Sequence, residues 1–102
     1  MENLEFERFG NSGVTVKYEG KLNLDTAAEY GGTIKDYVED EDITELVLDF
    51  DKIDYISSIG IRILVELNQK MASPKSMTVI NVGTQVIESL RMTGLDRFLK
   101  IN

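Results

Sequence analysis

The sequence predicts an α/β domain with a mixed sheet of four to five strands, an N-terminal antiparallel hairpin and three main helices. Two alternating apolar–polar segments near the N-terminus, joined by turn-forming residues, predict the hairpin. Strand-like and helix-like segments then alternate, which is typical of parallel strands joined by right-handed crossovers. The 102 residues are 42% hydrophobic and contain no linker, so one domain is expected over residues 1–102.

The hairpin is predicted from residue alternation. Leu4–Glu7 alternates apolar and polar residues, and Val14–Glu19 does so more regularly. Gly10–Gly13 reads Gly-Asn-Ser-Gly, a run of turn formers. Gly20 is expected to end the second strand.

The first helix is predicted to begin at Thr26. Thr26-Ala27-Ala28-Glu29 matches a capping box, in which the Thr and Glu side chains satisfy free backbone N–H groups. The acidic run Glu39–Asp42 has the wrong sign for a helix C-terminus, so early fraying is expected there. The apolar residues that recur at helical spacing are Ala27, Tyr30, Ile34, Tyr37 and Val38.

The second half of the chain predicts two further strands and two further helices. Leu46–Phe50 is nearly all apolar, as expected of a central strand covered on both faces. Asp51–Ile56 is expected to connect this strand to a helix over residues 58–71. A strand over Met77–Val82 and a helix over Thr84–Thr93 follow, with Gly94 at the C-terminal cap position.

The last residues are expected to close the core and to form a short final strand. The residues assigned to this role are Leu95, Phe98, Leu99 and Ile101. On the second helix, Arg62 with Glu66 and Glu66 with Lys70 are i,i+4 pairs, which support a helix modestly.

Composition argues against several classes of function. The net charge of -7 argues against binding nucleic acid or anionic membranes. Cys is absent, which excludes disulfides and thiolate metal sites, and His is absent, which removes the commonest general base. No transmembrane or signal segment is predicted, so a cytoplasmic protein is expected. No cofactor is expected either.

The residues best placed for chemistry lie between the central strand and the second helix, from Asp49 to Arg62. Functional residues concentrate beyond the carboxyl ends of parallel strands, and a helix N-terminus stabilises an anion. The plainest interpretation is that Ser57 or Ser58 caps the helix. The carboxylates of this segment do not have the spacing of a calcium loop, so no metal site is expected.

Three segments together resemble the anti-sigma factor antagonist family, which is built on the STAS domain. Gly20–Ala27 resembles the family's segment between the second strand and the first helix. Leu46–Arg62 resembles its signature strand, loop and helix start, and Met92–Phe98 resembles its closing segment. The resemblance covers nearly the whole chain and implies a STAS-like fold.

The resemblance implies that Ser58 is a phosphoacceptor. In the family, an anti-sigma factor with serine-kinase activity modifies the Ser that stands two residues before the Gly, and a metal-dependent phosphatase reverses the change. The unmodified antagonist binds the kinase and frees the sigma factor. The implied partner-binding residues are Asn23, Asp25, Thr26, Tyr55, Ile56, Ser57, Ser58, Ile59, Gly60 and Arg62.

Three functions therefore remain open from the sequence. The first is the antagonist controlled by phosphorylation, which would not be an enzyme. The second is a constitutive STAS scaffold in a signalling assembly or a lipid-transport complex; Ser57 and Ile59, which differ from the family's usual residues, favour it somewhat. The third is a hydrolase that uses Ser58, against which the lack of His weighs heavily.

Overall fold

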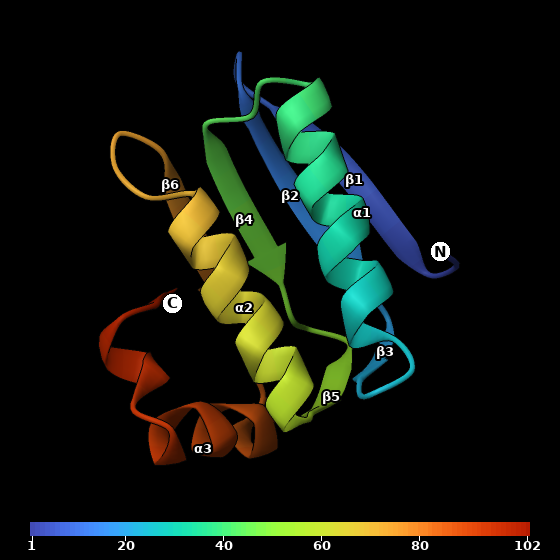
Figure 1. Ribbon diagram of the computed structural model, residues 1–102, viewed down its shortest axis with the longest axis vertical. Coiled ribbons are helices and arrows are strands. Elements are labelled where there is room, and N and C mark those ends of the chain that lie inside the picture. Colours follow the sequence, from blue (N-terminus) through green and yellow to red (C-terminus); the bar gives the residue numbers. More distant parts are fainter.

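The computed structural model describes residues 1–102 and contains the mixed sheet, the hairpin and the three helices that the sequence predicts (Figure 1). The main sheet has five strands in the order β1-β2-β4-β6-β7. Strands β1 and β2 pair antiparallel, and the other neighbours pair parallel. The elements are β1 (Leu4–Phe9), β2 (Gly13–Tyr18), β3 (Gly20–Leu22), α1 (Ala27–Asp40), β4 (Glu45–Asp49), β5 (Ile53–Ile56), α2 (Ser58–Lys70), β6 (Ser76–Ile80), α3 (Thr84–Met92), a 3-10 turn (Leu95–Arg97) and β7 (Lys100–Ile101).

The inner face of the main sheet follows from the period-2 alternation of its strands. Val16 of β2 lies opposite Leu48 of β4, which lies opposite Val79 of β6, and all three side chains are fully buried. On the outer face, Val47 and Asp49 are only half-buried. The prediction that this strand is covered on both faces was therefore wrong.

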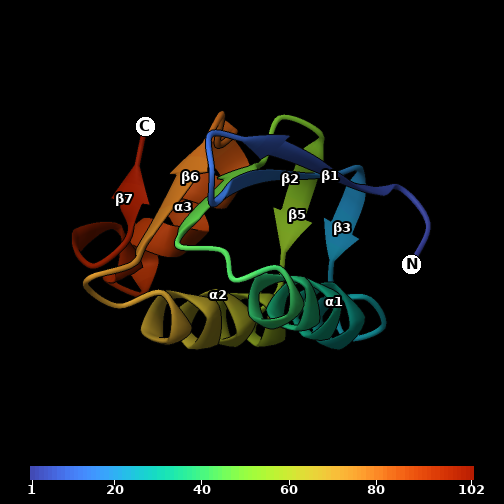
Figure 2. The same cartoon turned by 90° about the horizontal axis from the view of Figure 1, so that it is seen from above.

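Helices α1 and α2 lie side by side against one face of the sheet (Figure 2). Gly31 lets them approach closely, because a Cβ added there would lie 2.5 Å from Cγ2 of Ile63. Lys70 of α2 donates to the carboxylate of Glu39 on α1, and this hydrogen bond lowers the pKa of Glu39. Lys70 therefore pairs across the helices rather than with Glu66, and α1 continues to Asp40 instead of ending early.

A second, two-stranded parallel sheet of β3 and β5 was not predicted. Gly20, expected to end a strand, begins β3 with a φ of 143°, and its N–H donates to the carbonyl of Lys52 at 3.1 Å. Ile56 of β5 lies opposite Leu22 of β3. The segment Asp51–Ile56, which was expected to be only a connection after β4, is thus partly a strand. This strand ends two residues before the first residue of α2.

Two local expectations were also wrong. Thr26 has helical dihedral angles and its side chain caps nothing, so the capping box does not form. Phe98 is 73% exposed and lies outside the core, whereas Leu99 is buried as expected. Gly94 does follow α3 in the left-handed conformation, at a φ of 78°. No helix has both the length and the apolar character needed to cross a membrane.

Tyr30 is buried with a hydroxyl that has no hydrogen-bond partner. Tyr30→Phe is expected to raise the free energy of unfolding at pH 7 by about 1 kcal/mol, because it removes an unsatisfied buried polar group. Burial, with a smaller contribution from Tyr18, raises the pKa of Tyr30 above its unfolded value. The Tyr30 hydroxyl therefore ionises more easily in the unfolded chain than in the folded one. The wild type keeps its full free energy of unfolding below about pH 10 and loses part of it at higher pH.

Urea unfolding at pH 7 and pH 11 checks this expectation. The Phe variant should lose less stability at the alkaline pH than the wild type does. Tyr37→Phe is the control, because Tyr37 is only half-buried and stacks on Phe6. A variant at position 30 that is less stable than wild type at pH 7 would show that the hydroxyl is satisfied.

Candidate functional site

The two adjacent serines at the start of α2 have different environments. Ser57 is the N-cap: its Oγ accepts from the N–H of Gly60 at 3.3 Å and donates to the carbonyl of Leu22 at 3.0 Å. The N–H of Ser57 also donates to that carbonyl, at 2.8 Å. Ser57 therefore ties the beginning of α2 to the end of β3, and its hydroxyl is fully engaged.

Ser58 is the first residue of α2 and is exposed. Its hydroxyl makes no hydrogen bond within the chain, in contrast to that of Ser57. The free backbone N–H groups of the first turn give this helix end partial positive charge. An accessible hydroxyl is thus held where an added anion would be stabilised.

The loop between β3 and α1 lies beside this helix start and is fixed by its own side chains. Oδ1 of Asn23 accepts from the N–H groups of Asp25 at 3.0 Å and Thr26 at 3.2 Å. The Thr26 hydroxyl donates to the carbonyl of Lys21 and accepts from the N–H of Asn23 at 3.1 Å. This bonding leaves the Leu24 side chain 76% exposed at the tip of an ordered loop.

Tyr55 adds a second exposed apolar group close to the same end of the molecule. It lies on β5 opposite Lys21 of β3, and its side chain is 47% exposed. Nζ of Lys21 lies 5.8 Å from the centre of the Tyr55 ring and 3.5 Å from Oδ1 of Asp54. The ring is therefore presented beside an ion pair on the small sheet.

The structure brings the residues implied by the resemblance to one end of α2, at different depths. The exposed members are Asp25, Tyr55, Ser58 and Arg62. The half-buried members are Asn23, Thr26, Ser57 and Ile59. Ile56 and Gly60 are buried, so they support the surface from beneath rather than forming it. We call the exposed set, with Leu24, the docking surface.

Leu24 was not among the residues that the sequence predicted for this site. It lies within the loop that the sequence indicated, but nothing distinguished it except that it is an apolar residue in a polar turn.

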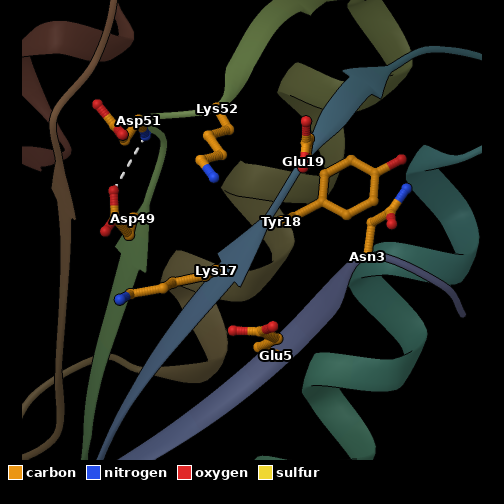
Figure 3. A pocket seen from close by; sticks show the side chains of 8 residues that line it. All are labelled: Asn3, Glu5, Lys17, Tyr18, Glu19, Asp49, Asp51 and Lys52. Carbon is orange, nitrogen blue, oxygen red and sulfur yellow. Dashed lines mark hydrogen bonds between the residues drawn. The ribbon is translucent and has the colours of Figure 1, made fainter.

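A cavity of about 290 Å³ lies at the other end of the small sheet (Figure 3). Its lining is mainly charged, and Asp49 accepts there from the N–H of Asp51 at 3.0 Å and from Nδ2 of Asn81 at 3.1 Å. Lys17 extends from this lining and pairs with Glu7 at 3.2 Å. No cluster of acidic side chains in the chain is arranged to hold a metal ion. The cavity is therefore a depression lined mostly by charged side chains.

Comparison with known proteins identifies the family. The sequence matches the family model of the STAS domain over residues 4–102. The chain belongs to this family.

Individual relatives agree with this assignment. The chain is 27% identical over 82 residues to the anti-sigma-F factor antagonist RsfB of Mycobacterium tuberculosis; the match covers 80% of this chain and 66% of RsfB. The chain thus spans slightly under two thirds of the length of that curated relative. A Thermotoga maritima structure, 18% identical, aligns with a TM-score of 0.89 over 98% of this chain and 86% of its own. The phosphorylated form of Bacillus SpoIIAA, 13% identical, aligns with a TM-score of 0.73 over 97% and 90%. At these identities the structures show a shared fold.

Proposed function

We propose that this STAS domain is an anti-sigma factor antagonist that binds an anti-sigma factor with serine-kinase activity and is switched off by phosphorylation of Ser58. The observation that carries the proposal is the exposed, unbonded Ser58 hydroxyl at the start of α2, at the same end of the molecule as the exposed side chains of Leu24 and Tyr55. The name of the mycobacterial relative supports the general function. The solved phosphorylated form of SpoIIAA supports control by phosphorylation.

The chemistry places few demands on this chain. The γ-phosphoryl group passes from ATP to Oγ of Ser58, the hydroxyl proton goes to a base of the kinase, and ADP leaves. Ser58 therefore needs access rather than an altered pKa. Ser57 is a poor acceptor, because its modification would break the N-cap and the hydrogen bond to Leu22.

The same arrangement favours a protein that is substrate and ligand rather than enzyme. A nucleophilic serine needs an adjacent base, and the Ser58 hydroxyl has no hydrogen bond to a carboxylate or an amine. Before modification, Leu24 and Tyr55 supply apolar contact area and Arg62 a charge for the kinase. A phosphatase returns Ser58 to the unmodified form. The antagonist and its partners are expected to act in the cytoplasm.

Phosphorylation changes the surface through charge. A phosphoryl group adds about -1.5 to -2 charges and three acceptor oxygens. In the free protein the helix N-terminus and water stabilise this charge. In a docked complex the group must lose water and occupy space between the two surfaces, so the complex is weakened more than the free protein.

Leu24→Asp is expected to weaken binding of the kinase encoded in the same genome by about 10- to 100-fold. The reason is that an exposed Leu buried on docking contributes about 1.5–3 kcal/mol. Isothermal titration calorimetry with the kinase in its ADP form, which cannot phosphorylate Ser58, measures this affinity directly.

The matched control is Phe98→Asp, because Phe98 is 73% exposed, close to the 76% of Leu24, but follows α3, outside the docking surface. Its affinity should remain within about twofold of wild type. Equal losses in both variants, or no loss at Leu24, would remove the docking surface from the proposal. Wild-type binding that is insensitive to phosphorylation would instead identify a constitutive scaffold.

A further inference from the structure

Ser58, Arg62 and Glu66 are successive i,i+4 neighbours in one inclined row on the exposed side of α2. They are spaced four residues apart, so successive Cβ atoms lie about 5–6 Å from one another. All three residues are exposed, and Nε of Arg62 lies 3.9 Å from Oε1 of Glu66. Arg62 is thus placed between a carboxylate one turn toward the C-terminus and the unbonded hydroxyl of Ser58 one turn toward the N-terminus.

The pair between Arg62 and Glu66 is weak by three criteria: its length, its exposure and the order of its residues. Its 3.9 Å separation is long for a charge-assisted hydrogen bond, and both side chains are more than half exposed. Its order is also unfavourable, because an i,i+4 pair on a helix is more stable when the acidic residue precedes the basic one. Helical side chains lean toward the N-terminus, which directs Arg62 toward Ser58.

We propose that phosphorylation of Ser58 transfers Arg62 from Glu66 to the phosphate, so that Arg62 becomes the internal counter-ion of the modified state. This inference deepens the proposed function and rests on it. Phosphoserine 58 and Arg62 form an i,i+4 pair in the favourable order, and a phosphate presents up to twice the charge of a carboxylate. The guanidinium can also bind two phosphate oxygens at once.

The transfer adds a second element to the switch. Modification not only places a phosphate in the docking surface but also withdraws the one exposed guanidinium that the surface offers to a partner. Other charged groups on the neighbouring elements already have partners. Lys21 of β3 pairs with Asp54 of β5, and Glu29 of α1 lies 3.6 Å from the N-terminal amine. Asp25 in the adjoining loop contributes a negative charge whether or not Ser58 is modified.

The test uses full-length protein with phosphoserine installed at position 58 by genetic code expansion, so no kinase is needed. The titration of the phosphate is followed by 31P NMR at low ionic strength. Arg62→Gln should move the midpoint up by about 0.3 pH unit, because loss of the cation disfavours the dianion. Glu66→Gln should move it down, because Arg62 loses its competing partner.

Lys35→Gln is the matched control, since Lys35 is an exposed cation on α1 that forms no ion pair and its loss removes the same charge. Its midpoint should stay within about 0.1 pH unit of the unsubstituted protein. Equal shifts for Arg62→Gln and Lys35→Gln, or none for either, would overturn the inference. A kinase that fails to modify Ser58 would contradict the proposed function while leaving this titration unaffected.

Discussion

Gly60→Ala is expected to lower the free energy of unfolding by about 1–3 kcal/mol. Gly60 is buried in the first turn of α2, where a Cβ would lie 2.9 Å from the carbonyl oxygen of Leu22 and 2.7 Å from Cγ1 of Ile56. The carbonyl belongs to the backbone of β3 and cannot rotate away as a side chain can. To admit the methyl group, α2 must move away from β3, which stretches the two hydrogen bonds that the hydroxyl and the N–H of Ser57 donate to the Leu22 carbonyl.

Gly32→Ala provides a control with the same chemical change. Gly32 is exposed in the middle of α1, and a Cβ there would meet nothing within 4 Å. That variant should gain about 0.5–1 kcal/mol, since Gly is unfavourable inside a helix. Urea unfolding followed by circular dichroism measures both values. If alanine stabilises both positions equally, the close approach of α2 to β3 is not present in solution.

The parts of the fold that the sequence predicts well are those whose pattern is local. The alternation of Val14–Glu19 and the helical spacing from Tyr30 to Val38 each contain the information for one element. The β3–β5 sheet could not be predicted in this way. Gly20–Leu22 and Ile53–Ile56 are too short to show a period, and their stability comes from pairing segments that are far apart in the sequence.

The sequence predicted that the site lies at the start of a helix. The spacing of its residues did not predict which of the two serine hydroxyls there is free. Sequence spacing alone left Ser57 and Ser58 as equal candidates for the N-cap. The carbonyl of Leu22, 35 residues before Ser57, decides between them by accepting from the Ser57 hydroxyl. The resemblance indicated Ser58 as the acceptor, and the free, exposed hydroxyl is compatible with that role. The exposure of Leu24 depends in turn on the hydrogen bonds of Asn23, which no periodicity reveals.

Phosphorylation at Ser58 is expected to weaken binding to the kinase by about 30- to 1000-fold, which corresponds to a loss of about 2–4 kcal/mol. The phosphate carries its charge into a surface that becomes desolvated on docking. Of the exposed side chains on that surface, Leu24 cannot hydrogen-bond to the phosphate and Tyr55 offers a single hydroxyl, so water lost on docking is not fully replaced. By contrast, the free protein keeps the phosphate at a solvated helix N-terminus beside Arg62, so its own fold should be little changed.

Position 73 offers a control of equal charge. Ser73 is exposed in the loop after α2, away from the docking surface, so phosphoserine there changes the net charge without changing that surface. Its affinity for the kinase should stay within about threefold of the unmodified chain.

The most direct measurement is therefore the dissociation constant of the kinase, in its ADP form, for three homogeneous proteins: unmodified, phosphoserine at 58, and phosphoserine at 73. We expect only the protein modified at position 58 to lose at least 30-fold in affinity. A phosphoserine 58 protein that remains folded and binds as tightly as the unmodified chain would contradict a switch at this serine.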